Sequence, residues 1–207
     1  MIIAGSGHRP SKLGGYNLPN PIYCYVCQQI EKVLLELKPE KVISGMCIGY
    51  DQYLANIAIK LKIPLLAAIP FEGQEKKWTT SYQRIYNKLL SKASEIVIVS
   101  PPGYSAEKMQ IRNEFMVDRC DILLACWDRS AGGTGNCVKY AQSVKKTEEI
   151  IFIDPRLWLD KKNRGVILLM WYNTILGVWR NLADAEVSKT FGLYARVGSS
   201  PTMPTNF

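Results

Sequence analysis

The sequence is poor in residues that bind metals. His8 is the single histidine, and among the six cysteines only Cys24 and Cys27 form a Cys-x-x-C pair. A structural zinc site needs a second pair of ligands at similar spacing, which the chain does not offer. We therefore expect no metal and no cofactor, and we expect reduced cysteines that serve as small buried side chains.

Long apolar runs are also missing. The longest one, residues 166–179, is interrupted by Asn173 and Thr174 and is too short to cross a membrane. Residues 1–4 lead directly into a glycine, without the basic and apolar regions of a secretory signal. These observations predict a cytoplasmic protein with no membrane partner.

Acidic residues are few compared with basic ones. The chain of 207 residues has 18 Asp and Glu against 26 Lys and Arg, which gives a net charge of +8. This balance favours an anionic partner, but it does not distinguish a nucleotide from a nucleic acid or an acidic surface. With 47% hydrophobic and 21% charged residues, the composition is that of a globular protein and excludes a mostly disordered chain.

Short apolar runs alternate with helical patterns along residues 1–154, which we expect to form one domain. Strands are expected at residues 2–4, 41–45, 63–69, 95–100, 121–127 and 149–154. Helices are expected at residues 23–37, 51–61, 78–92, 106–119 and 136–145. This alternation predicts an α/β, Rossmann-like fold, with a mostly parallel sheet and helices on both faces. Ligands of such folds bind at the carboxyl ends of the strands.

A first glycine-bearing loop follows the first expected strand, with the sequence Gly5-Ser6-Gly7-His8-Arg9-Pro10. Its glycines let the backbone approach an anion, and Arg9 can form paired hydrogen bonds with a phosphate or carboxylate. The spacing is not Gly-x-Gly-x-x-Gly, and no acidic residue ends the second strand. Ordinary binding of a nicotinamide dinucleotide is therefore disfavoured.

A second loop, from Ser44-Gly45 through Gly49 to Asp51, leads from the second strand into a helix. Two interpretations of Asp51 are open at this point. Its side chain could cap the helix, or it could accept a hydrogen bond from a sugar hydroxyl while Ser44 and Gly45 line a phosphate or ribose pocket.

A third loop runs from Asp128 to Asn136 and contains Gly132-Gly133-Thr134-Gly135 at an expected helix start. Free amides and the helix dipole make such a start an anion site. The loop lacks the lysine of a P-loop, which argues against hydrolysis of a nucleoside triphosphate. Arg112 and Asn113, on the preceding helix, are expected to reach this loop.

Aromatic residues offer two further candidates. Phe71 or Trp78 could stack on a base while Gln74 reads the edge of that base, or these residues could simply pack a lid. On the helix at 106–119, the side chains of Met109, Phe115 and Met116 are expected to face the core.

The order of four motifs resembles the SLOG superfamily, and most closely its YpsA-like branch, which is common in bacteria and phages. The motifs are Gly-Ser-Gly-His-Arg-Pro, Ser-Gly-Met-x-x-Gly-x-Asp, Met-Gln-x-Arg-Asn-x-x-Met and Gly-Gly-Thr-Gly, within residues 1–154. The resemblance implies a Rossmann-like fold that binds nucleotides or nucleotide-derived small molecules at the strand ends.

The Lonely Guy enzymes of this superfamily hydrolyse the N-glycosidic bond of nucleoside monophosphates. Residues 112–116 resemble their Arg-Lys-x-x-Met signature, with Asn113 in place of the lysine, and residues 131–139 resemble their glycine loop. Lys139 stands where the resemblance implies a catalytic carboxylate, and lysine cannot act as one. Hydrolysis would need a different acid, with Asp51, Glu114 and Asp128 as candidates beside Arg112.

Three hypotheses remain. The leading one is a sensor or sequestering protein that binds an ADP-ribose-like ligand, a cyclic nucleotide or a nucleoside monophosphate. The others are a nucleotide N-glycosidase (phosphoribohydrolase), and a single-stranded DNA-binding protein similar to the DNA-processing protein A branch. The expected ligand-binding residues are Gly5, Ser6, Gly7, His8, Arg9, Ser44, Gly45, Gly49, Asp51, Phe71, Gln74, Arg112, Asn113, Asp128, Gly132, Gly133, Thr134, Gly135 and Asn136.

The last part of the chain, residues 155–207, is not covered by the resemblance. Residues 166–179 are apolar nearly all round and predict a buried helix, and the residues from Ser188 onward resemble an extended arm. We expect this region to form a homo-oligomer, with a helix that covers the sheet of a monomer as the alternative.

Overall fold

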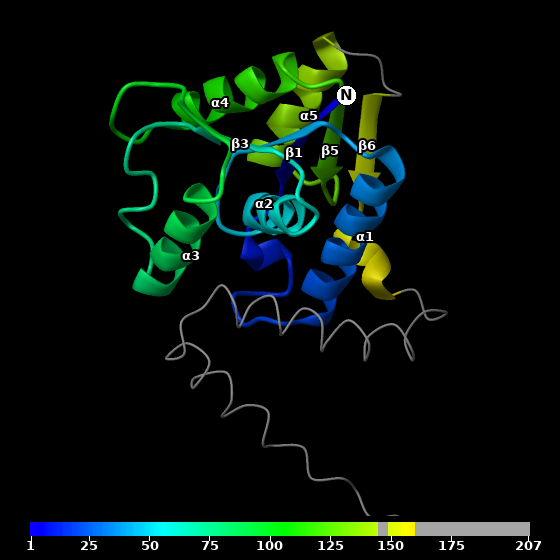
Figure 1. Ribbon diagram of the computed structural model, residues 1–207. Helices are drawn as coiled ribbons and strands as arrows, with labels where there is room; N and C mark the ends of the chain where they lie inside the picture. The colour runs from blue at the N-terminus through cyan, green and yellow to red at the C-terminus, as the bar shows by residue number, and fades with distance from the viewer. Residues whose placement is uncertain (145–148, 160–207) are drawn as a thin grey trace, which may run out of the picture.

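A parallel sheet of six strands carries helices on both of its faces in the computed structural model, which describes residues 1–144 and 149–159 (Figure 1). The strands are β1 (Ile2–Gly7), β2 (Lys41–Ser44), β3 (Leu65–Ile69), β4 (Glu95–Ile98), β5 (Ile122–Cys126) and β6 (Ile150–Ile153). The helices are α1 (Pro21–Leu37), α2 (Tyr50–Lys60), α3 (Thr80–Leu90), α4 (Ala106–Asp118) and α5 (Gly133–Val144), with short 3-10 helices at η1 (Pro10–Lys12) and η3 (Pro155–Leu159). The predicted α/β class is confirmed.

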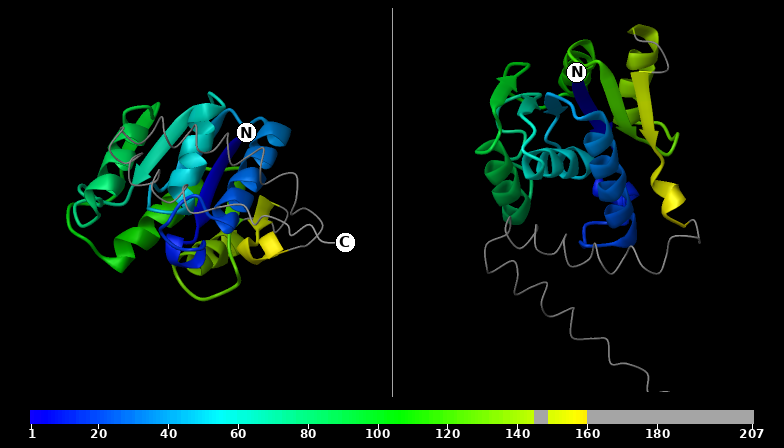
Figure 2. Two further views of the ribbon diagram at one scale, coloured as in Figure 1. Left: turned by 90° about the horizontal axis from the view of Figure 1, so that it is seen from below. Right: turned by 45° about the vertical axis from the view of Figure 1, so that its right-hand side comes forward.

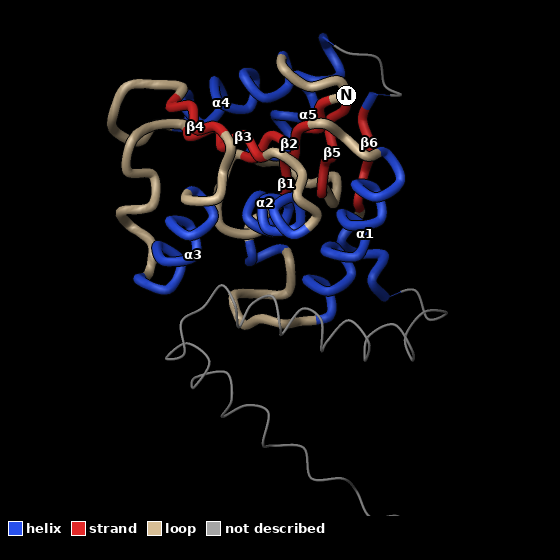
Figure 3. The backbone as a smooth tube through the Cα atoms, viewed as in Figure 1, coloured by secondary structure: helices blue, strands red, loops and turns tan. Residues whose placement is uncertain are grey.

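The order of the strands places a ligand crevice between β1 and β5. Along the sheet the order is β4-β3-β2-β1-β5-β6, and every pairing is parallel (Figure 3). The chain moves outward from β1 to β4 and then returns to β5 on the other side of β1. The loops that leave β1 and β5 therefore diverge at this switch point, where open sheets of this type bind their ligands.

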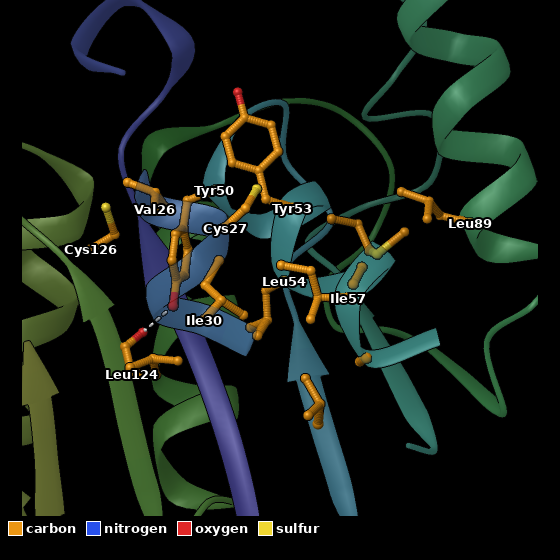
Figure 4. Packing of buried hydrophobic residues seen from close by; sticks show 14 of the residues in the cluster. Val26, Cys27, Ile30, Tyr50, Tyr53, Leu54, Ile57, Leu89, Leu124 and Cys126 are labelled. Atoms are coloured by element: carbon orange, nitrogen blue, oxygen red, sulfur yellow. Dashed lines mark hydrogen bonds between the residues drawn. The ribbon is translucent and has the colours of Figure 1, made fainter. Parts of the chain in front are cut away.

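The helices divide between the two faces as right-handed crossovers require, with α1, α2 and α3 on one face and α4 and α5 on the other (Figures 1 and 2). On the first face Tyr50 is fully buried, and its hydroxyl donates to the carbonyl of Leu124 across 3.1 Å (Figure 4). A Cβ on Gly7 would meet the ring of Tyr50, and a Cβ on Gly5 would meet Leu54. Both glycines are therefore needed so that α2 can lie close against β1.

Two features expected in residues 155–207 are not part of the described fold. The apolar helix expected at residues 166–179 and the arm from Ser188 lie outside the described residues, so the homo-oligomer expected through this region stays a prediction. η3, which begins that region, packs beside α1. Within the described residues, no helix is both long enough and apolar enough to span a membrane.

Candidate functional site

A cavity of about 450 Å³ opens where the β1 and β5 loops diverge, a volume typical of small-molecule sites. Its walls come from the loops after β1, β2 and β5, from the β4–α4 loop, from the first half of α4 and from the first turns of α2 and α5. Many of the residues expected at the site line this one cavity: Ser6, Gly7, His8, Arg9, Asp51, Arg112, Asn113, Gly132, Gly133, Thr134, Gly135 and Asn136.

The start of α5 presents backbone amides to this cavity. The Asn136 amide donates to the Gly132 carbonyl across 2.9 Å, which closes the first helical turn. The amides of residues 133–135 precede it and have no acceptor within their own helix. A Cβ on Gly132 or Gly133 would meet nothing within 4 Å, so the space in front of this turn is open. The expected contact from α4 is present, because Asn113 Nδ2 donates to the Gly133 carbonyl across 3.4 Å.

Arg112 forms the floor of the cavity rather than reaching the third loop as expected. Its side chain is buried, and Nη1 donates to Asp51 Oδ2 across 3.3 Å while Nη2 contacts Cys47 Sγ at 3.6 Å. Its Nε is buried and has no hydrogen-bond partner among the described residues. The guanidinium passes over the end of β2 at Gly45, where a Cβ would collide with Nη1 and lie 2.8 Å from Asp51 Oδ2.

The opposite charges of Arg112 and Asp51 counteract the effect of burial on the pKa of each group. Burial raises the pKa of Asp51 above its ordinary value, and the positive charges of Arg112 and Arg9 limit that rise. Burial acts to lower the pKa of Arg112, but the neighbouring Cys47 and Asp51 outweigh it, so its pKa lies above the ordinary value. Arg112 therefore carries a positive charge beneath the cavity.

The second loop decides against one of the two interpretations of Asp51, whose side chain lines the cavity but does not cap α2. The N-cap of α2 is Gly49, with a φ of 104°, and Asp51 lies inside the first turn, so the expected Asp51 cap is wrong. The Asp51 carboxylate instead accepts from Arg112 and from the Cys47 amide. Ser44 is fully buried and donates to the Asp51 carbonyl across 2.7 Å. Ser44, Gly45 and Gly49 shape the loop and do not line the cavity.

His8 and Asp128 join the β1 and β5 loops at the cavity wall. His8 Nε2 lies 2.8 Å from Asp128 Oδ1 and 3.0 Å from the Asp128 amide nitrogen. Burial lowers the pKa of His8, which favours the neutral ring that accepts from this amide, although the Asp128 carboxylate pulls the pKa upward. Burial also acts to raise the pKa of Asp128, but hydrogen bonds from the Ser130 hydroxyl and amide, together with the neighbouring His8, bring it well below its ordinary value. Asp128 does not line the cavity, but its carboxylate is paired with His8 and Ser130, which do.

The single imidazole should report on this arrangement. We expect the ring signals of His8 to titrate below pH 6.5, the ordinary value, in the folded protein. Asp128→Asn should lower the pKa of His8 further, because it removes the negative charge that opposes the effect of burial. Titration followed by NMR measures both values, and an unchanged or higher His8 pKa in the variant would contradict the described pairing.

Several expected site residues lie outside the cavity. Phe71 is buried and packs its ring against Tyr104, and Trp78 packs against Tyr86 at 5.4 Å between ring centres. Gln74 is buried and donates to the Tyr86 hydroxyl across 3.3 Å. Glu114 accepts from Gln110 across 2.9 Å and is not part of the lining. Gly5 is buried in β1 and also lies outside it.

Sequence reasoning did not place every lining residue at the site. The additional lining residues are Ser11, Lys12, Cys47, Tyr104, Ala106, Met109, Gln110, Ser130 and Ala131. Met109 was expected in the core, yet it is half-buried and faces the cavity, whereas Met116 is fully buried as expected. Tyr104 had a usable signal, because it follows a Pro-Pro-Gly turn at the end of a strand, where ligand loops lie.

Comparison with known sequences points to one family. A family model described as the YspA SLOG family matches residues 3–155. The SPbeta prophage-derived protein YoqJ of Bacillus subtilis is 32% identical to this chain over 145 residues, which cover 62% of this chain and 81% of that protein.

Solved structures with a similar fold include two DNA processing proteins A. The Streptococcus pneumoniae protein matches with a TM-score of 0.55 and 14% identity, over 84% of this chain but only 56% of that longer protein. The Helicobacter pylori protein, described by its single-stranded DNA binding mode, matches with a TM-score of 0.53 and 15% identity over 86% of this chain and 80% of that one. At such identities the likeness establishes the fold.

Proposed function

Because this chain belongs to the YspA SLOG family, we propose that it binds a nucleotide-derived small molecule through a phosphate group, as a sensor or sequestering protein. The observation that carries the proposal is the convergence of the α5 amides with Arg112 on a single cavity. ADP-ribose-like ligands, cyclic nucleotides and nucleoside monophosphates all contain such a phosphate.

The polar groups around the cavity suit a phosphate. The open amides of residues 133–135 and the positive end of the α5 dipole favour an anion, and the Thr134 hydroxyl lines the same wall. Arg112 carries its positive charge in the lining of the same cavity, and this charge attracts an anion there. Arg9 is exposed at the mouth of the cavity and adds positive charge there.

Binding accounts for this site better than hydrolysis does. Lys139, at the position where related glycosidases carry a carboxylate, is exposed and does not line the cavity. Of the candidate acids, only Asp51 lines it, and its carboxylate is already bound by Arg112 and the Cys47 amide. Glu114 and Asp128 do not line the cavity, and their carboxylates are paired with Gln110 and His8.

A negative charge at the start of α5 tests the proposal. Gly133→Glu places a carboxylate at the amides, and we expect it to weaken binding of ribose 5-phosphate by roughly tenfold through repulsion between like charges. Gly133→Gln is the matched control, because it has nearly the same size without the charge. Isothermal titration calorimetry gives both affinities.

The folded state should tolerate both variants, because a Cβ on Gly133 meets nothing within 4 Å and a glutamate favours the first turn of a helix. Equal affinities in the Glu and Gln variants would contradict a phosphate at this helix start. A failure of ribose 5-phosphate to bind the natural protein would contradict it as well.

Single-stranded DNA binding is a second candidate, favoured by the fold likeness to the Helicobacter pylori protein and by the net charge of +8. Such binding would weaken steeply as salt concentration rises. Fluorescence anisotropy of a labelled oligonucleotide at two salt concentrations distinguishes it from a small-molecule site.

A further inference from the structure

An exposed aromatic ring stands at the part of the cavity wall formed by the β4–α4 loop. Tyr104 lines the cavity and is 73% exposed, the largest exposure of any large hydrophobic residue in the described part of the chain. Most of its ring surface is therefore open. A planar ring beside a polar cavity offers a stacking surface, which every nucleobase can use.

The loop that carries Tyr104 is held in place. The Lys108 ammonium donates to the carbonyls of Pro101, Pro102 and Gly103 across 2.9, 2.9 and 3.0 Å. The Ser105 hydroxyl accepts from the Lys108 amide across 3.1 Å and caps α4. These four hydrogen bonds fix the chain on either side of Tyr104.

The ring of Tyr104 packs against a buried aromatic neighbour. Tyr104 meets buried Phe71 edge to face, with 6.0 Å between ring centres and 83° between ring planes. Such a pair contributes to the order of the exposed ring without covering it. An ordered exposed ring loses little freedom when a ligand stacks on it.

Neighbouring residues of α4 continue the same wall. Met109 lines the cavity, and its thioether can contact the edge of an aromatic ring. Gln110 donates its Nε2 to the Glu114 carboxylate across 2.9 Å, which leaves the Gln110 carbonyl oxygen as an acceptor. The wall thus combines a flat ring, a soft apolar side chain and an acceptor, which matches the face and edge of an amino-substituted base.

From this arrangement we propose that Tyr104, with Met109 and Gln110 beside it, forms a nucleobase subsite, so that the ligand is a nucleoside phosphate and not a sugar phosphate or inorganic anion. The inference rests on the proposed function, because the phosphate at the start of α5 places the ligand in the cavity. Tyr104 is then the specificity-determining residue, and Lys108 is a positioning residue that acts through the loop.

Two probes separate the base from the phosphate. Calorimetry with the full chain should give adenosine 5′-monophosphate about tenfold higher affinity than ribose 5-phosphate, as one base stacked on an aromatic ring implies. Tyr104→Ala should abolish this difference while leaving ribose 5-phosphate affinity unchanged, and Tyr104→Phe should keep it.

Tyr16→Ala is the matched control, because Tyr16 is also an exposed tyrosine in an edge-to-face pair, with Tyr82, but does not line the cavity. It should leave both affinities unchanged. Lys108→Met should bring the affinities for the two probes closer together. It should leave the affinity for ribose 5-phosphate unchanged.

The outcomes distinguish this subsite from the phosphate site. If ribose 5-phosphate and adenosine 5′-monophosphate bind equally well, or if Tyr104→Ala weakens both to the same extent, the nucleobase subsite is wrong while the phosphate site stands. If neither probe binds the natural chain, the phosphate site is wrong and the subsite falls with it.

Discussion

Arg112→Ala is expected to lower the free energy of unfolding by about 3–5 kcal/mol, the usual loss when one partner of a buried ion pair is removed. Asp51 is only 5% exposed, and the substitution would leave its carboxylate buried without the guanidinium that lies 3.3 Å away. Urea denaturation at neutral pH measures this loss.

Lowering the pH should reduce the loss of stability that Arg112→Ala causes. Without Arg112, burial raises the pKa of Asp51 in the folded state further above its unfolded value. A raised folded pKa destabilises the protein at pH values above it, and the loss is recovered as the pH falls through that pKa. Adding Asp51→Asn should restore much of the stability at neutral pH, because no uncompensated charge remains. A loss below about 1 kcal/mol for Arg112→Ala, typical of exposed pairs, would contradict the buried pair.

Gly45→Ala is expected to cost about 2–3 kcal/mol, since a new methyl group in a packed site forces side chains to shift. The Cβ would overlap the Arg112 guanidinium and lie 2.8 Å from Asp51 Oδ2. Gly45 has no positive φ, so the cost reflects this overlap and not backbone strain. Chemical denaturation of the variant gives the value.

A double-mutant cycle identifies the cause of this cost. In the Arg112→Ala background the guanidinium is absent, so Gly45→Ala should cost much less than it does alone. Additive losses from the two substitutions would show that the Gly45 methyl group meets something other than Arg112. As a control, Gly133→Ala should be close to neutral, because its Cβ meets nothing within 4 Å.

The sequence alone predicted the fold because local patterns determine it. The run at 63–69 contains the fully buried strand β3, and the expected glycine-bearing loops follow β2 and β5, whereas Gly5 and Gly7, expected in a loop, form the end of β1. The meeting of the first and third loops in one cavity follows from this topology. Four motifs in fixed order also led to the family that the comparisons support.

Side-chain contacts between distant elements could not be predicted in this way. Arg112 and Asp51 lie 61 positions apart, and only the crossing of α4 over the end of β2 brings them together. Gly7 was interpreted as an approach point for an anion, and its closeness to Tyr50 depends on how α2 packs against β1. Phe71 was expected to stack on a base, but packing buries it and leaves Tyr104 exposed. Each of these outcomes depends on tertiary geometry that one sequence does not encode locally.

We expect a phosphate to bind in the cavity that the α5 amides and Arg112 line together. A titration of ¹⁵N-labelled protein with ribose 5-phosphate, followed by NMR, tests it most directly. We predict saturable shifts of the backbone amides of residues 133–135 and of the Arg112 Nε–H signal, with the amide of Gly103 unmoved. Saturable shifts confined to other residues, or no shifts at all, would contradict the claim.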